Sequence, residues 1–184
     1  GLRAGQGSDP PQATRVQATS LPLFDQVPGS WQLGADDRAM LGWAARLHEV
    51  GISIAQGAYH KHSAYILANA DMPGFSRQEQ GWLSNLVLAQ RGKLAKMRAA
   101  FDDDPRLAAL ALCLRLAVIF YRSRRTLGLP RMALARDGRE WRLAVEPGWL
   151  EGYPLVQLAL EREREEWESV GWRFTLAEAL PAAA

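Results

Sequence analysis

The stretch LAALALCLRLAVIFY, residues 107 to 121, is almost wholly apolar. Its apolar residues would lie on every side of a helix, which is the pattern of a helix buried inside a protein. Asp104 precedes the stretch as an N-cap, and Pro105 suits the first helical position. The sequence therefore predicts a central helix that begins at Asp104 and Pro105 and ends near Gly128.

This run is too short and too charged to cross a membrane. Arg115 interrupts it and Arg122 follows it, whereas a spanning helix needs about 20 predominantly apolar residues. Cys113 is the only cysteine, which excludes a disulfide framework and a CxxC metal site. We expect Cys113 to be a buried, unreactive thiol. The lone cysteine and the lack of a signal-peptide pattern favour a cytoplasmic protein without a membrane span.

The overall composition is that of a folded protein with balanced charge. Hydrophobic residues make up 48% of the 184 positions, which is enough for a sizeable core. Lys and Arg number 22 and Asp and Glu 20, so the net charge of +2 predicts no general attraction to nucleic acid or membranes. Any binding of anions must depend on local clusters of basic residues.

Local signals predict further helices before the central one. Residues 36 to 48 carry acidic residues first and then apolar residues at helical spacing, and Gly51 is expected to end this helix. A short apolar element over residues 63 to 70 leads into a turn at the DMPGF segment, residues 71 to 75. Ser76 and Glu79 match a capping box for a helix that runs to about residue 91.

After Pro130 the apolar period changes from helical to two. The Asp137–Gly138 turn lies between alternating apolar residues and predicts a β-hairpin. A helix follows over residues 154 to 169, and alternation over residues 172 to 176 predicts a third strand. Residues 1–20, rich in Gly, Pro, Gln, Ser and Thr, predict a linker or boundary segment.

The three histidines invite comparison with a metal site. His48 precedes Glu49, and His60 and His62 follow within fifteen residues. This faintly resembles metal phosphohydrolases of the HD superfamily, in which a His-Asp pair supplies two ligands. No second His-Asp pair follows, and His48 lies on the apolar stripe of its helix. We therefore interpret His48 as a core histidine and expect no metal ligands.

Nucleophile and phosphate-loop motifs are absent from the sequence, but basic residues cluster. The GxSxG elbow and the GxxxxGK[ST] loop do not occur, so no catalytic residue is predicted. Arg and Lys suit a polyanion because they can contact successive phosphates and release counterions. Each cluster could equally be a solvated face or a helix end. The clusters are Lys61 between two histidines, then Arg91, Lys93, Lys96 and Arg98, then Arg122, Arg124 and Arg125.

A long segment resembles a known family. WAARLHEVGISIAQGAYHKHSAYILANADMPGFSRQEQ, residues 43 to 80, resembles without gaps the C-terminal region of the exopolyphosphatase and guanosine pentaphosphate phosphohydrolase family. LRLAVIFYRSRR, residues 114 to 125, and LEREREEWESVGWRF, residues 160 to 174, resemble later helices and the terminal strand of that family. The resemblance covers about residues 15 to 179.

The resemblance implies a mainly α fold. An HD-like helical domain would span residues 21–128, and a small α+β domain of hairpin, helix and terminal strand would span residues 129–184. It also implies a parent phosphatase whose two N-terminal actin-like domains, absent from this chain, hydrolyse the substrate with magnesium. The region present would be non-catalytic, would need no cofactor, and would line a channel for polyphosphate and contribute to a homodimer.

The HKHSAYIL segment, residues 60 to 67, resembles exopolyphosphatases more than the other subgroup, so inorganic polyphosphate is the expected partner. The alternatives left open are guanosine pentaphosphate, a purely structural dimerisation module, and a metal-dependent hydrolase acting alone. The residues predicted to bind substrate are His60, Lys61, His62, Arg91, Lys93, Arg122, Arg124 and Arg125.

Overall fold

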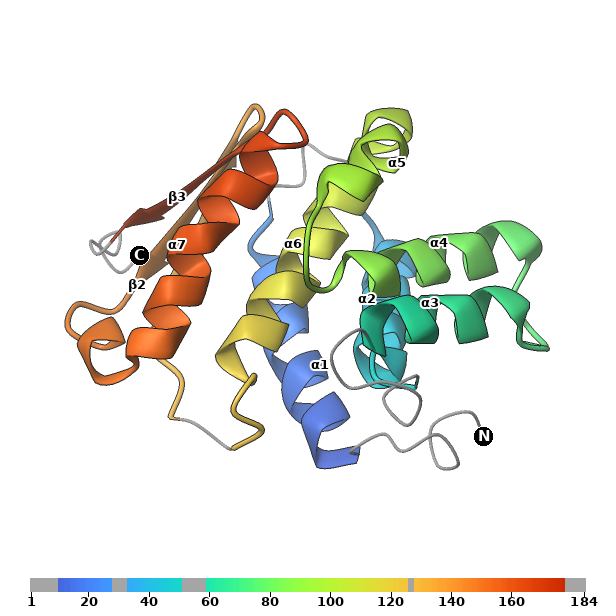
Figure 1. Ribbon diagram of the computed structural model, residues 1–184, viewed down its shortest axis with the longest axis horizontal. Coiled ribbons are helices and arrows are strands. Elements are labelled where there is room, and N and C mark those ends of the chain that lie inside the picture. Colours follow the sequence, from blue (N-terminus) through green and yellow to red (C-terminus); the bar gives the residue numbers. More distant parts are fainter. Residues whose placement is uncertain (1–9, 28–32, 51–58, 126–127, 178–184) are drawn as a thin grey trace.

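The computed structural model describes residues 10–27, 33–50, 59–125 and 128–177, which are mainly helical with a small sheet near the C-terminal end (Figure 1). This confirms the predicted fold class, mainly α with a small α+β appendage. The elements are α1 Pro10–Asp25, α2 Ala35–Leu47, α3 Tyr59–Asn69, α4 Arg77–Ala89, the 3₁₀ helix η2 Ala95–Met97, α5 Arg98–Asp103, α6 Pro105–Phe120, β1 Met132–Asp137, β2 Glu140–Val145, the 3₁₀ helix η3 Leu150–Gly152, α7 Pro154–Glu168 and β3 Arg173–Ala177.

Helix α6 is the predicted central helix. Its position in Figure 1 is between α7 on one side and α3 and α4 on the other, and residues 107–120 are all buried. The Asp104 carboxylate accepts a hydrogen bond of 3.1 Å from the Arg106 amide and caps the first turn. Cys113 is buried as expected, and burial raises the pKa of its thiol. Among the described helices, none combines the length and apolar character of a membrane span.

Helix α6 ends at Phe120, earlier than the predicted end near Gly128. The apolar run stops at Tyr121, and the exposed arginines after it cannot continue a helix that is buried on all sides. Arg124 instead adopts a left-handed backbone conformation with φ of 61°. The chain therefore turns here and presents its basic residues at the end of α6.

The prediction of a linker over residues 1–20 is wrong from Pro10 onward, because helix α1 begins there. The helix packs on α2 and α6 with Val16 and Leu23 buried, and Gln12 donates a hydrogen bond of 2.7 Å to the Tyr121 carbonyl. The buried face also contains Gln12 and Ser20, so its apolar period is weak in the sequence. Residues 1–9 lie outside the described part.

The predicted capping signals are confirmed. Ser76 Oγ accepts from the Glu79 amide at 3.0 Å, and Glu79 accepts from the Ser76 amide at 3.0 Å, which completes the capping box of α4. The predicted turn before it contains Gly74 with φ of 89°. Gly51, the expected end of α2, lies outside the described residues.

The hairpin and the third strand are also confirmed. Strand β1 pairs antiparallel with β2 in a register that places Leu134 opposite Leu143, and Gly138 has φ of 58° in the turn. Strand β3 pairs parallel with β2, so α7 is the crossover helix and covers one face of the sheet (Figure 1). The predicted domain boundary at residue 128 stays a prediction.

A cluster of aromatic rings joins this sheet to the helices. Trp141 and Trp172 stack with ring centroids 5.2 Å apart, and Trp167 of α7 meets both edge-on. Trp167 also stacks on Phe101 of α5, with ring centroids 5.8 Å apart. The core is therefore continuous from α5 through α7 to the sheet.

Candidate anion-binding surface

Two segments far apart in the sequence meet at His60. His60 lies in the first turn of α3 and is 6% exposed. The loop after α4 passes over it at Gly92, where a Cβ atom would lie 3.3 Å from His60 Nε2 and 3.8 Å from Lys96 Nζ. Gly92 has φ of 76°, which favours glycine. The loop therefore brings basic side chains against α3.

Several positively charged side chains lie near His60. Burial first, and then the nearby charges of four cations, together lower the pKa of His60 to about 4; the cations are Lys96, Arg91, Lys61 and Arg115. His60 is therefore neutral at neutral pH and does not add to the charge of the cations around it. A group of cations that repel one another is a place where an anion is stabilised.

The pKa of Lys96, one of these cations, is also lowered by its surroundings. Desolvation first, and then the charges of Arg115 and Lys61, lower the pKa of Lys96 to about 8. The Glu166 carboxylate acts in the opposite direction. Its side chain is exposed, so a ligand can reach it. Lys96 thus loses its proton at a lower pH than an ordinary lysine does, and a bound anion would raise its pKa again.

Arg115 lies beneath the loop and is paired on its other side. Its guanidinium donates to Glu163 of α7, with 2.6 Å between Nη2 and Oε1. It also donates to the carbonyls of Ala89 at 2.8 Å and Gly92 at 3.0 Å. Trp167 Nε1 donates to the same Glu163 carboxylate at 3.0 Å. This buried network ties α6, α7 and the loop together.

A second group of predicted residues meets at the end of α6. Arg91, Arg122 and Arg124 line a cavity of about 80 Å³ together with Gln12, Glu49 and Val118. Glu49 is 3% exposed, and Arg124 donates to both of its carboxylate oxygens, Nη2 lying 3.0 Å from Oε1. Arg124 is therefore ion-paired with Glu49, whereas the Arg122 side chain is exposed.

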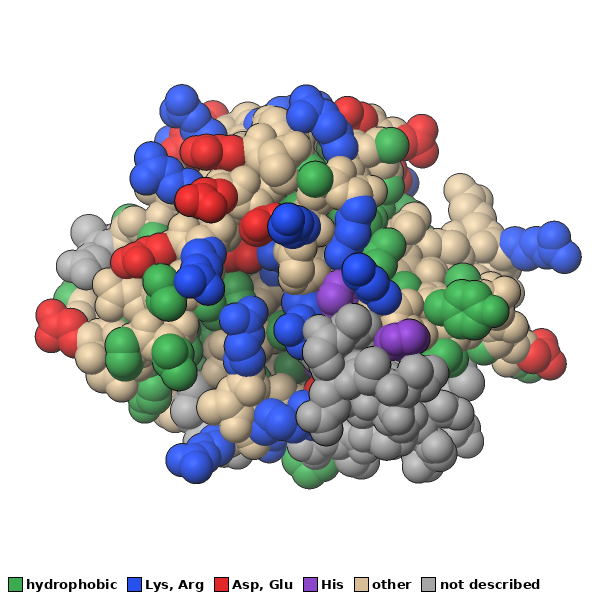
Figure 2. Space-filling view, viewed as in Figure 1, with side chains coloured by type: hydrophobic (Ala, Val, Ile, Leu, Met, Phe, Trp, Pro, Cys, Tyr) green, Lys and Arg blue, Asp and Glu red, His purple; other side chains and the backbone are tan. Residues whose placement is uncertain are grey.

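Arg91 belongs to both groups, and the two groups form one patch that we call the basic surface. Figure 2 shows Lys and Arg side chains gathered over the middle of one face, beside histidine side chains. Lysine and arginine spaced along a surface can contact successive phosphates of one ligand. The residues of the basic surface are Lys61, Arg91, Lys96, Arg122 and Arg124, with His60 beneath them.

The structure thus places five of the eight predicted binding residues at the basic surface: His60, Lys61, Arg91, Arg122 and Arg124. His62 is half-buried, Lys93 and Arg125 are exposed, and none of the three lines the cavity at the end of α6.

The predicted binding set left out Lys96 and Arg115. The sequence does indicate that Arg115 has a structural partner, because a charged residue inside an apolar helix needs a buried partner. Lys96 carried no comparable signal, since it was one of four basic residues in a group.

His48 and Glu49 are engaged within the fold. His48 is 1% exposed, and its Nδ1 lies 2.6 Å from the Ala45 carbonyl, to which the protonated nitrogen donates. The Glu49 carboxylate accepts from Arg124. Within the described ranges, no three His, Cys, Asp or Glu side chains group closely enough to hold a metal ion.

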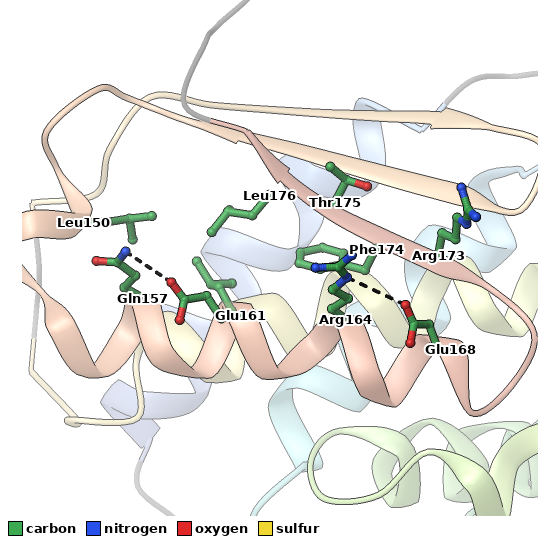
Figure 3. Close-up of a pocket in the computed structure, with 10 residues that line it drawn as sticks. Leu150, Gln157, Glu161, Arg164, Glu168, Arg173, Phe174, Thr175 and Leu176 are labelled. Atoms are coloured by element: carbon green, nitrogen blue, oxygen red, sulfur yellow. Dashed lines mark hydrogen bonds and ion pairs between the residues drawn. The ribbon is translucent and has the colours of Figure 1, made fainter.

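A larger cavity of about 640 Å³ lies between α7 and β3 (Figure 3). Its charged residues are two carboxylates and two arginines, Glu161, Glu168, Arg164 and Arg173. Figure 3 shows Arg164 directed at Glu168, 3.7 Å away. None of the predicted binding residues lines this cavity. Its balanced charge makes it a weaker anion site than the basic surface.

Comparison with known proteins shows the family. Residues 8–164 match the model of "Ppx/GppA phosphatase, domain III". The guanosine-5'-triphosphate,3'-diphosphate pyrophosphatase of Pseudoalteromonas atlantica is 34% identical over 173 residues, which cover 91% of this chain and 34% of that protein. The protein of the same name from Pseudoalteromonas translucida is 35% identical over 171 residues, which cover 90% of this chain and 34% of that protein. The chain therefore spans about a third of the length of these curated relatives. With most of its residues matched by the family model, the chain belongs to the Ppx/GppA phosphatase family, as the sequence resemblance implied.

Proposed function

We propose that this chain binds the linked phosphates of a phosphatase substrate on its basic surface. The observation that carries the proposal is the convergence of Lys61, Arg91 and Lys96 on the neutral His60. Several positive side chains that face one another favour a ligand with several negative charges along its length. Hydrolysis itself would take place in the part of the parent protein that this chain does not include, where magnesium is expected.

The identity of the phosphate ligand has two candidates. The resemblance of HKHSAYIL favours inorganic polyphosphate, whereas both relatives are named for guanosine-5'-triphosphate,3'-diphosphate. Both molecules carry consecutive phosphates, which is the feature that the basic surface would recognise. Only the nucleotide also carries a base and a sugar, so the two ligands can be separated by experiment.

Calorimetric titration of the chain tests the proposal. Long-chain polyphosphate and guanosine-5'-triphosphate,3'-diphosphate would each be titrated at about 50 and about 200 mM salt. Binding that weakens with salt supports the proposal, and tighter binding of one ligand identifies the preferred class. The absence of binding to either ligand, at both salt concentrations, would overturn it.

Arg91→Ala and Arg77→Ala form a matched pair for this experiment. Each removes one arginine near an end of α4, but only Arg91 belongs to the basic surface. Loss of one charged contact is expected to weaken binding about tenfold in Arg91→Ala. Equal weakening in Arg77→Ala would show that net charge, and not the basic surface, governs binding.

A homodimer is the second candidate role, and it concerns the start of α7, which adjoins Arg122 of the basic surface. Leu155 is 80% exposed and Leu158 is 42% exposed at the start of α7, beside an apolar cavity of about 490 Å³ that also includes Phe120 and Val156. Exposed leucines beside an apolar cavity are typical of a protein interface. Sedimentation of the wild type and of Leu155→Ser would test it, since a dimer at this face should dissociate in the variant.

A further inference from the structure

The loop that carries Arg91 and Lys96 is held from two helices. From α6, Arg115 donates to the Ala89 and Gly92 carbonyls. From α7, the Glu166 carboxylate accepts a hydrogen bond of 2.9 Å from the Leu94 amide. Leu94 is fully buried, so its amide would otherwise be a costly unpaired donor. The loop is therefore attached to the C-terminal part of the molecule.

Glu166 is not at a position where a carboxylate stabilises its own helix. It is in the last turn of α7, where the helix dipole disfavours a carboxylate. A pair with Arg162, four residues earlier in α7, is the interaction that helical spacing offers Glu166, but its carboxylate accepts from the Leu94 amide instead. Glu166 therefore stabilises the loop and not its own helix.

We propose that Glu166 is a positioning residue, which holds the loop from α7 so that Arg91 and Lys96 flank His60. The inference rests on the proposed anion-binding function and extends it. It assigns the small C-terminal unit a part in binding without any contact between that unit and the ligand. The buried Arg115–Glu163 pair next to it keeps α7 in the place from which Glu166 reaches the loop.

Positioning and simple electrostatics predict opposite signs for one substitution. Glu166 adds negative charge beside a site for anions, so its removal would strengthen anion binding if charge alone mattered. If Glu166 positions the loop, Glu166→Ala weakens binding by about fivefold, the effect of one lost hydrogen bond. Glu166→Gln keeps an acceptor oxygen for the Leu94 amide without the charge, so its binding should equal or exceed that of the wild type.

Glu165→Ala is the matched control. Glu165 is the neighbouring residue on α7, is exposed, and carries the same charge. Alanine is the best helix former, so α7 should remain intact in both alanine variants. Binding of long-chain polyphosphate and of guanosine-5'-triphosphate,3'-diphosphate would be measured by calorimetry for the wild type and the three variants.

Hydrogen exchange at the Leu94 amide gives a readout that needs no ligand. Faster exchange and weaker binding in Glu166→Ala, with neither change in Glu165→Ala, would support the inference. Unchanged exchange, or faster exchange with unchanged or stronger binding, would overturn the inference while the proposed function stands. A wild type that binds neither ligand would overturn the proposed function, and the positioning role with it.

Discussion

Arg115 Nη2 lies 2.6 Å from Glu163 Oε1 in a buried ion pair that joins α6 to α7. The two side chains are 4% and 5% exposed, so neither charge is compensated by water. The remaining donors of Arg115 bind two carbonyls at the end of α4, and Trp167 binds the other carboxylate oxygen. One buried pair therefore supports the loop of the basic surface and the aromatic core together.

Arg115→Met is expected to lower the free energy of unfolding by about 3–5 kcal/mol, because it leaves the Glu163 charge buried without its partner. Urea denaturation measures this loss. The double variant Arg115→Met/Glu163→Gln should regain part of it, since glutamine is uncharged and still accepts from Trp167. A double variant less stable than the single one would contradict this account.

Binding of phosphate ligands is expected to weaken as the pH rises through about 8, the value to which the pKa of Lys96 is lowered. Lys96 loses its positive charge there, about two units below an ordinary lysine. Calorimetry across this pH range measures the change. Lys96→Arg should remove the step because arginine keeps its charge. A step that persists in this variant would assign it to another group.

Acid is expected to destabilise the chain through His60, whose pKa is lowered from 6.5 to about 4. The unfolded state binds the proton first, so stability falls as the pH drops from about 6.5 to about 4, by up to about 3 kcal/mol. Urea denaturation at several pH values measures the fall. His60→Gln should show a smaller fall over this range, and an identical fall would exclude His60 as the cause.

Arg124 and Arg122 are expected to differ in what they support. Arg124→Ala leaves Glu49 buried without its partner, and should lower the free energy of unfolding by about 2–4 kcal/mol. Arg122→Ala should cost less stability, because Arg122 is exposed, but should weaken phosphate binding. Thermal unfolding and calorimetry of both variants separate the two roles. The reverse pattern would make Arg124 the main ligand contact.

Ser76→Ala should lower the free energy of unfolding by about 1 kcal/mol, because the Glu79 amide loses its cap. Ser76 begins α4 at the end opposite the basic surface, so phosphate binding should not change. This variant controls for the effect of stability on binding. Weaker binding in Ser76→Ala would mean that general destabilisation accounts for the losses seen in the other variants.

The elements of this chain follow from local signals in its sequence. Caps at Ser76 and Asp104, the turn at Gly138 and the change of apolar period after Pro130 each act over a few neighbouring residues, so the sequence predicts them well. Helix α1 was missed because its buried face includes Gln12, and its helical state depends on packing against α2 and α6.

The basic surface depends on tertiary packing in the same way. Lys61, Arg91 and Arg122 come from three separate segments, and the pattern of one segment does not show which others it will face. The partner of Glu166 was likewise determined by the fold. Helical spacing alone would pair Glu166 with Arg162, whereas in the folded chain the buried Leu94 amide needs an acceptor and Glu166 provides it. Local chemistry therefore determined the helices and strands, whereas the burial of distant groups against one another determined the site.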